Sequence, residues 1–245
     1  MRYPGQVAPA HPPGGQGMEP FADLLAASAA AHGHLCPGQV VGVRMAILGC
    51  RLIDLTDPTS DDQIKKCMVF VEMDRCAGDA VAHVTGVKLG RRSLKFVDYG
   101  IMAATFINLE SVKAFRVICT EEARDLACHY APQISEKDKQ QLEAYQRMPD
   151  SVLFRVQQVE VVLSEFDLPG PTRRKVSCSR CGQTVRDHRE VVVNGENLCR
   201  PCAYGGYYNN AREITWPDMN WAPLPAGSPS TSLRTGRQLS ANSKD

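Results

Sequence analysis

The sequence of 245 residues contains no long apolar run and almost no excess of charge of one sign. A transmembrane helix needs about 20 consecutive apolar residues, whereas the most apolar stretch, residues 40–50, is interrupted by Gly42, Arg44 and Gly49. We therefore expect no membrane partner. Lys and Arg number 28 against 27 Asp and Glu. Wrapping of nucleic acid needs a broad basic excess, so it is not favoured as the main role, although a local basic patch fits this balance.

The first residues also lack the apolar segment of a secretory signal. Residues 1–18 are rich in Pro, Gly, Gln and Ala, and we expect them to form a disordered leader. The expected location is the cytoplasm, where thiols stay reduced. The ten cysteines are then core residues, metal ligands or reactive thiols rather than a disulfide framework. Four of them lie in helix or strand patterns and are expected to be core residues: Cys50, Cys67, Cys119 and Cys128.

Common enzyme signatures are missing as well. The sequence has no Gly-x-Gly-x-x-Gly fingerprint and no Ser/His/Asp order or paired-carboxylate motif. The loop at residues 85–95, TGVKLGRRSLK, has glycines and cations but not the spacing of a phosphate-binding loop. It is either a solvated basic turn or an anion-binding loop.

The hydrophobic pattern predicts an α+β fold with helices packed on a mixed sheet. Thr120 is expected to cap one helix, and Ser135 with Asp138 to form a capping box for another. The expected helices span residues 21–34, 36–50, 76–86, 120–130 and 135–148, and the expected strands span 65–74, 93–100, 102–110, 113–120 and 151–163.

Composition divides the chain into a larger and a smaller domain. A Pro-, Gly- and Arg-containing segment at residues 167–175 reads as a linker. It separates an α+β domain at 19–166 from a compact cysteine-rich unit at 176–206, a small zinc ribbon. Residues 207–245 are polar and rich in Pro, Ser and Asn, and we expect a mostly disordered tail.

Two Cys-x-x-Cys pairs, Cys178/Cys181 and Cys199/Cys202, define the ribbon. Residues 182–198 separate them, within the spacer of about 15–20 residues that zinc sites use. Each turn presents two thiolates, so the two turns together fill the tetrahedron of a structural zinc ion and leave no open position. Two disulfides are disfavoured by the reducing compartment, and four unrelated core thiols by the spacing. Thiol-disulfide exchange by a lone Cys-x-x-Cys is disfavoured because the pair is duplicated at ribbon spacing.

The ribbon also carries many cations, which support two readings equally. They could contact phosphate, since zinc ribbons often bind nucleic acid or proteins. They could instead offset the charge of about −2 that four thiolates and one Zn²⁺ create. The residues concerned are Arg173, Arg174, Lys175, Arg180, Arg186, Arg189 and Arg200.

A second group of ligand-type residues stands near the N-terminus. His32, His34 and Cys36 lie within the segment AHGHLCPG, and Cys76 follows in DRCAGDA. Imidazole and thiolate suit zinc and similar transition metals. Spacing alone leaves three readings open: a metal site, a partly buried thiol beside a helix-capping histidine, and a low-pKa Cys36 thiol at a helix N-terminus.

Long motifs in this chain closely resemble the FmdE family, proteins similar to the FmdE component of formylmethanofuran dehydrogenase. The segments are HGHLCPGQVVGVRMAILG, CAGDAV, TGVKLGRRSLKFVDYGIMAATF and LFRVQQVEV, followed by the four-cysteine ribbon, and they cover roughly residues 20–205. The resemblance implies a mixed-sheet domain, commonly dimeric, with an attached zinc ribbon. It also implies a metal-binding active site from His34, Cys36 and Cys76 with His32 beside them. Ile101 stands where the family pattern has lysine.

From this resemblance we expect a metal-binding accessory protein or subunit in molybdenum- or tungsten-dependent one-carbon metabolism, of the formylmethanofuran or formate dehydrogenase type. Cys36 and Cys76 are the candidate catalytic residues. The expected cofactors are structural zinc in the ribbon and a second transition metal, zinc by preference, in the first domain. The expected partners are a second copy of the chain and a molybdenum or tungsten dehydrogenase complex. The rival functions are an adaptor that binds nucleic acid or protein through its ribbon, and a thiol- or metal-dependent enzyme acting on a small molecule.

Overall fold

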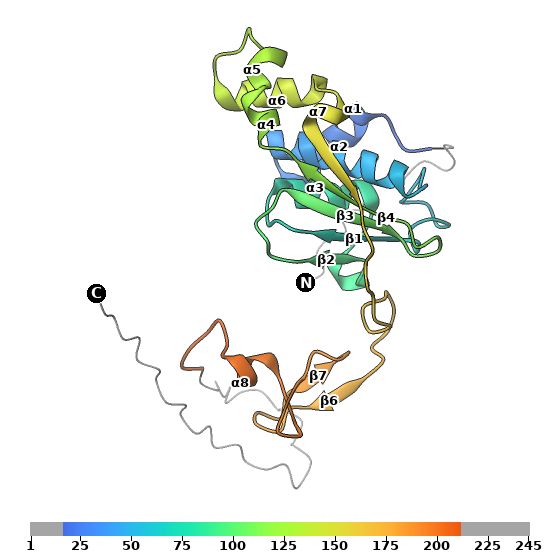
Figure 1. Cartoon of the computed structure of the whole chain (residues 1–245), viewed down its shortest axis with the longest axis vertical. Helices are drawn as coiled ribbons and strands as arrows, with labels where there is room; N and C mark the ends of the chain where they lie inside the picture. The colour runs from blue at the N-terminus through green and yellow to red at the C-terminus, as the bar shows by residue number, and fades with distance from the viewer. Residues whose placement is uncertain (1–16, 212–245) are drawn as a thin grey trace, which may run out of the picture. The chain divides into compact units, whose positions relative to one another are not determined.

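The computed structural model describes residues 17–211 (Figure 1). They form two compact units, and the boundary along the sequence lies between Pro171 and Thr172. This boundary falls inside the segment that the sequence marks as a linker. The expected leader at 1–18 and tail at 207–245 lie almost wholly outside the described residues.

The first unit is built on a five-stranded mixed sheet with the order β2-β1-β3-β4-β5. Only β1 and β2 run parallel, and helix α3 connects them, while the other neighbours are antiparallel. The predicted α+β class is therefore confirmed. The strands are β1 (Cys67–Val71), β2 (Leu94–Phe96), β3 (Ala103–Asn108), β4 (Ala114–Cys119) and β5 (Phe154–Gln158).

Helices cover one face of this sheet. The helices are α1 (Phe21–His32), α2 (Pro37–Leu52), α3 (Cys76–Thr85), α4 (Glu122–Asp125), α5 (Ala127–Tyr130), α6 (Lys137–Arg147) and α7 (Asp150–Leu153), with a 3-10 turn, η1 (Leu89–Arg91). Within residues 17–211, no helix has both the length and the apolar character needed to cross a bilayer.

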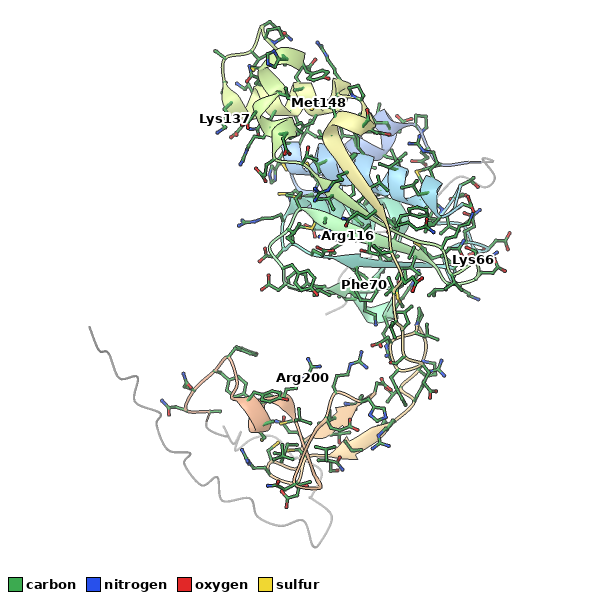
Figure 2. All side chains as sticks on the ribbon, viewed as in Figure 1. Lys66, Phe70, Arg116, Lys137, Met148 and Arg200 are labelled. Atoms are coloured by element: carbon green, nitrogen blue, oxygen red, sulfur yellow. The ribbon has the colours of Figure 1, made fainter. Side chains whose placement is uncertain are left out.

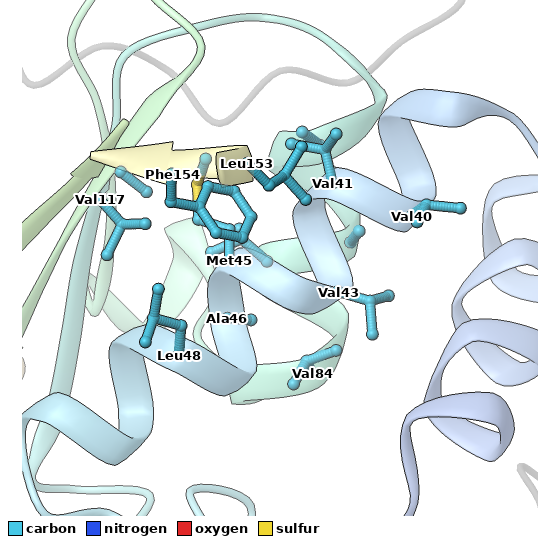
Figure 3. Close-up of a cluster of buried hydrophobic side chains, with 14 of the residues drawn as sticks. Val40, Val41, Val43, Met45, Ala46, Leu48, Val84, Val117, Leu153 and Phe154 are labelled. Atoms are coloured by element: carbon cyan, nitrogen blue, oxygen red, sulfur yellow. The ribbon is translucent and has the colours of Figure 1, made fainter. Parts of the chain in front are cut away.

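Helix α2 lies at the centre of the core because it is apolar on nearly all sides. Figure 3 shows Val40, Val43 and Met45 of α2, each with no exposed surface, among side chains from α3, β4, α7 and β5. The strands contribute through their alternation: Val69 and Val71 of β1 point to this core. The core thus fixes α2 against both the sheet and α3.

The opposite face of the sheet carries a smaller apolar cluster and one ion pair. Met68 and Ile107 pack there beneath residues 159–163, which follow β5. Beside them, Arg116 (labelled in Figure 2) donates two hydrogen bonds to Glu72, at 2.7 and 2.6 Å. Only 7% of the Glu72 side chain is exposed. The bidentate hydrogen bonding by Arg116 compensates for the cost of burying this carboxylate.

Glycine allows α2 and α3 to approach closely. A Cβ atom at Gly42 would lie 2.5 Å from the carbonyl oxygen of Ala77 and 2.6 Å from the Cβ of Ala80. One turn earlier, a Cβ at Gly38 would lie 3.0 Å from the Cβ of Cys76. The N-terminal ends of α2 and α3 therefore lie side by side.

The second unit consists of two small hairpins and a short helix. Its elements are β6 (Lys175–Ser177), β7 (Thr184–Arg186), β8 (Val191–Val193), β9 (Glu196–Leu198) and α8 (Arg200–Tyr204). β6 pairs with β7 and β8 with β9, all antiparallel. Its buried apolar cluster centres on Cys178, Leu198 and Cys199. This is the zinc-ribbon architecture that the cysteine spacing predicts.

Three local predictions were wrong. The segment 151–163 is not one strand: α7 precedes β5, and the chain beyond Gln158 leaves the ladder so that its apolar side chains cover Met68 and Ile107. The segment 120–130 forms two short helices. Neither expected cap forms, because the N-cap residues are Glu121 and Glu136, each without a side-chain cap bond.

Substitution of Gly42 by alanine should destabilise the first unit by about 1–3 kcal/mol, since the new methyl group would meet the α3 backbone. This is a net effect, because alanine's better helix propensity offsets up to about 1 kcal/mol. Urea unfolding measures it. Gly90→Ala is the matched control, since nothing lies within 4 Å of its Cβ position. Equal stability of the two variants would contradict the close helix crossing.

Candidate metal centre

The structure brings together all four candidate residues of the first unit. His32 ends α1, His34 lies in the following loop, Cys36 is the N-cap of α2, and Cys76 begins α3. One ligand atom from each of the four lies within 4.8 Å of the others. The sharp turn after α1 depends on Gly33, whose φ of 100° belongs to the left-handed region that glycine favours.

His32 is oriented as a metal-ligating histidine. Its Nδ1 lies 3.0 Å from Oδ2 of Asp79, one turn into α3. Its Nε2 is buried and has no hydrogen-bond partner among residues 17–211. A carboxylate on one ring nitrogen, which leaves the other nitrogen for the metal, is the usual arrangement around zinc-bound histidine. An orphaned buried nitrogen is costly without such a partner, so the donor set fits a metal ion.

The two thiols of this cluster influence each other. Burial raises the pKa of the Cys76 thiol, and the hydrogen bond with Cys36 raises it further. The free Cys76 thiol therefore stays protonated near neutral pH, which disfavours reading this residue as a metal-free thiolate nucleophile. A bound cation would reverse this balance, since coordinating thiols are deprotonated.

A buried hydrogen-bond chain crosses the three helices that carry the ligands. The Ser28 hydroxyl on α1 donates to Oε1 of Gln39 on α2, at 2.6 Å. Nε2 of Gln39 then donates to the carbonyl of Cys76, at 2.8 Å. Gln39 has no exposed surface and Ser28 only 1%. These two hydrogen bonds fix the N-terminal ends of α2 and α3 relative to α1.

Sequence reasoning missed three residues of this centre: Ser28, Gln39 and Asp79. Gln39 did carry a signal, because it is a polar residue at the start of an otherwise apolar, buried helix. Asp79 gave none, since its role depends on a partner 47 positions away in the chain.

A cleft of about 280 Å³ adjoins the cluster on the Asp79 side. His32, Asp79, His83 and Lys88 are among its lining residues. Lys88 belongs to the basic loop at 85–95, so one cation of that loop reaches the vicinity of the centre. Another, Arg92, donates to the carbonyl of Phe166 instead.

The remaining cysteines of the first unit separate by burial. Cys50 and Cys67 are fully buried, as expected for core residues. Cys119 is half-buried, and burial raises its pKa to about 12. Cys128 is exposed, so its assignment to the core was wrong.

The second unit holds the other cluster. The sulfur atoms of Cys178, Cys181, Cys199 and Cys202 lie within 4.8 Å of one another. Burial alone would raise the pKa of Cys178, but hydrogen bonds from backbone N–H groups outweigh it and lower the pKa to about 6. In contrast, burial and the neighbouring thiols raise the pKa of Cys202. The folded backbone thus favours the thiolate form of one of the four ligands.

Several ribbon cations have partners within the ribbon. Arg174 pairs with Glu190 at 3.1 Å, and His188 approaches the same carboxylate at 3.4 Å. Arg180 donates to the carbonyl of Cys202. The Arg180 contact places a positive charge beside the thiolate cluster, which favours the charge-offset reading.

Comparison with known proteins gives two family matches. A family model described as "FmdE, Molybdenum formylmethanofuran dehydrogenase operon" matches residues 31–160. A second, described as a prokaryotic dksA/traR C4-type zinc finger, matches residues 170–204. The first match contains all four residues of the N-terminal cluster, and the second contains all four ribbon cysteines.

A curated relative from Archaeoglobus fulgidus, named "Probable S-adenosyl-L-methionine-binding protein", is 28% identical over 204 residues. The alignment covers 76% of this chain and 53% of the relative, so the chain spans about half the length of that protein. Among solved structures, a tungsten formylmethanofuran dehydrogenase FmdE-like protein from Syntrophus aciditrophicus has a TM-score of 0.50 and 19% identity. It covers 77% of this chain and 94% of its own, a likeness of fold.

Replacing Gln39 by leucine should lower the free energy of unfolding of the first unit by about 1–3 kcal/mol. The Ser28 hydroxyl and the Cys76 carbonyl would both lose a buried partner. Gln146→Leu is the control, because Gln146 is an exposed glutamine on α6. Adding Ser28→Ala to Gln39→Leu should cost less than the sum of the single changes. If urea titrations showed that the two losses of unfolding free energy are strictly additive, the hydrogen bonds of Ser28 and Gln39 would not act as one coupled network.

Proposed function

The chain belongs to the FmdE family, and we propose on that premise that it is a metalloprotein whose N-terminal cluster holds a transition metal. His32, His34, Cys36 and Cys76 are the ligands that we assign. One observation carries the proposal: four ligand atoms converge within 4.8 Å. It is supported by the buried Nε2 of His32, which has no hydrogen-bond partner among residues 17–211.

The donor set favours zinc. Two thiolates and two imidazoles form a Cys₂His₂ set, which zinc binds with tetrahedral geometry. When bound, the metal would supply Lewis-acid character at this corner of the first unit. The chain's own contribution is orientation: Asp79 holds the His32 ring, and Gln39 holds the first residue of α3.

We further propose the setting: an accessory protein or subunit in molybdenum- or tungsten-dependent one-carbon metabolism, in the cytoplasm. The family description and the name of the structural relative support this assignment. A homodimer and a complex with a molybdenum or tungsten dehydrogenase belong to the same proposal. Copurification tests it: tagged full-length chain should retain a dehydrogenase that contains molybdenum or tungsten, and an eluate free of both metals would contradict the setting.

One observation supports a second candidate, a metal-dependent enzyme that acts on a small molecule. The cleft of about 280 Å³ is lined by His32 itself, so a small ligand there would lie next to the metal centre. Cys36 and Cys76 would then be residues of the reaction centre rather than of a closed structural site. An adaptor function through the ribbon has weaker support, because Arg174 and Arg180 are engaged within the ribbon.

Purified full-length chain should contain about two zinc ions, one per cluster. Cys178→Ser should remove one ion and unfold only the second unit, while Cys36→Ser should remove the other ion. Elemental analysis after dialysis counts the metals. Cys128→Ser is the control, because Cys128 is an exposed cysteine outside both clusters. A wild-type content of one ion, unchanged by Cys36→Ser, would refute the N-terminal site.

Asp79→Asn should weaken zinc binding at the N-terminal site about tenfold. Removing a residue that hydrogen-bonds to a metal ligand typically lowers metal affinity about 10–100-fold. We expect the low end of this range because 73% of the Asp79 side chain is exposed to water. Competition with a chromophoric chelator measures the affinity. Asp125→Asn, at an exposed aspartate of α4, should leave the affinity unchanged, and Asp79→Glu should recover part of it. Wild-type affinity in Asp79→Asn would rule out the orienting role.

A further inference from the structure

The structure holds the four N-terminal ligands to different degrees. Only 15% of the His32 side chain is exposed, and Asp79 fixes its ring. Cys36 is anchored by its backbone, whose carbonyl accepts the N–H of Gln39 at 3.0 Å. The carbonyl of Cys76 accepts the side chain of the same glutamine. Three of the ligands are thus fixed by hydrogen bonds that do not depend on a metal.

His34 has no comparable support. It is exposed, and it stands in the loop of residues 33–35 between the end of α1 and the N-cap of α2. Among residues 17–211, its imidazole has one recorded ring or polar contact, with the His32 ring at a centroid distance of 4.8 Å. Its neighbour Leu35 is also 47% exposed, so this side of the cluster faces solvent.

From this asymmetry we infer that His34 is an exchangeable ligand whose position a small molecule can take. The inference rests on the proposed metal site and names the coordination position that substrate would use. Without His34, the remaining set is Cys₂His with an open fourth position, the donor pattern of catalytic rather than structural zinc. His32, Cys36 and Cys76 keep the metal in place while the fourth ligand changes.

The chemistry of the site defines the class of incoming ligand. Two thiolates cancel the charge of Zn²⁺, so the centre is neutral and suits a donor of one nitrogen or one sulfur atom. His34 leaves and returns as a neutral imidazole. A thiol that takes its place loses its proton to solvent as its sulfur binds. No oxidant or reductant is needed, since only metal–donor bonds exchange.

The test uses the full-length chain loaded with Co²⁺, whose visible absorption reports changes in coordination. The variants are His34→Ala, His32→Ala and, as control, His129→Ala at an exposed histidine of α5. Metals per chain are counted first, and imidazole is then titrated. The ribbon contributes a constant background, because its four cysteines leave no open position.

We expect His34→Ala to retain two metal ions per chain and to show a saturable absorption change with imidazole. His32→Ala should retain one ion and respond to imidazole no more than the ribbon does. His129→Ala should match the wild type in both measurements. Mercaptoethanol should add a sulfur-to-cobalt charge-transfer band to His34→Ala at lower concentrations than to the wild type.

Two results would overturn the inference while leaving the metal site intact. His34→Ala could lose the N-terminal metal as completely as His32→Ala, which would make His34 an equal structural ligand. Alternatively, His34→Ala could keep both metals and show no response to imidazole or mercaptoethanol, which would make the position inaccessible. A wild-type chain with metal in the ribbon alone would instead refute the site itself, so the two failures are distinguishable.

Discussion

The hydrogen-bond chain from Ser28 through Gln39 to the carbonyl of Cys76 organises the first unit. It joins three helices at the points where their ends carry the ligand residues. Because Ser28 and Gln39 are buried, their side chains cannot exchange these partners for water without opening the core. The close approach of α2 and α3 at Gly42 supports the same geometry through packing. The cluster is therefore shaped by the fold before any metal binds.

The ribbon follows a different principle. Its apolar cluster consists mainly of the ligands themselves, with Leu198 beside them. Such a small unit cannot bury enough surface to fold by apolar contacts alone, so metal binding and folding are coupled there. Once the ribbon is folded, backbone N–H groups lower the pKa of Cys178 and so favour the thiolate form that a cation binds. The N-terminal cluster is thus a preorganised site, whereas we expect the ribbon cluster to form together with its metal.

Sequence alone was sufficient for the ribbon because its ligands come in two local pairs whose spacing is itself the signal. It was also sufficient for α1 and α2, whose ends differ from the expected spans, 21–34 and 36–50, by two residues at most. Residue types grouped Cys76 with His32, His34 and Cys36 as one of three open readings. The family resemblance then favoured the metal site, since spacing cannot show which helix ends meet. Asp79 and Ser28 required coordinates, because each acts on a residue of another helix. The strand prediction for 151–163 failed because the alternation of Val159, Val161 and Leu163 serves to cover a sheet face rather than to extend a ladder.

The division at Pro171 and Thr172 has a consequence for how the chain responds to scarcity of metal. The first unit has an extensive core of its own, so we expect it to keep its shape without metal, whereas the ribbon would lose its main source of stability. Depletion of zinc would then unfold the ribbon and leave the first unit folded. Proteases that begin at an unfolded segment could then engage the ribbon, so the lifetime of the protein would depend on the supply of zinc.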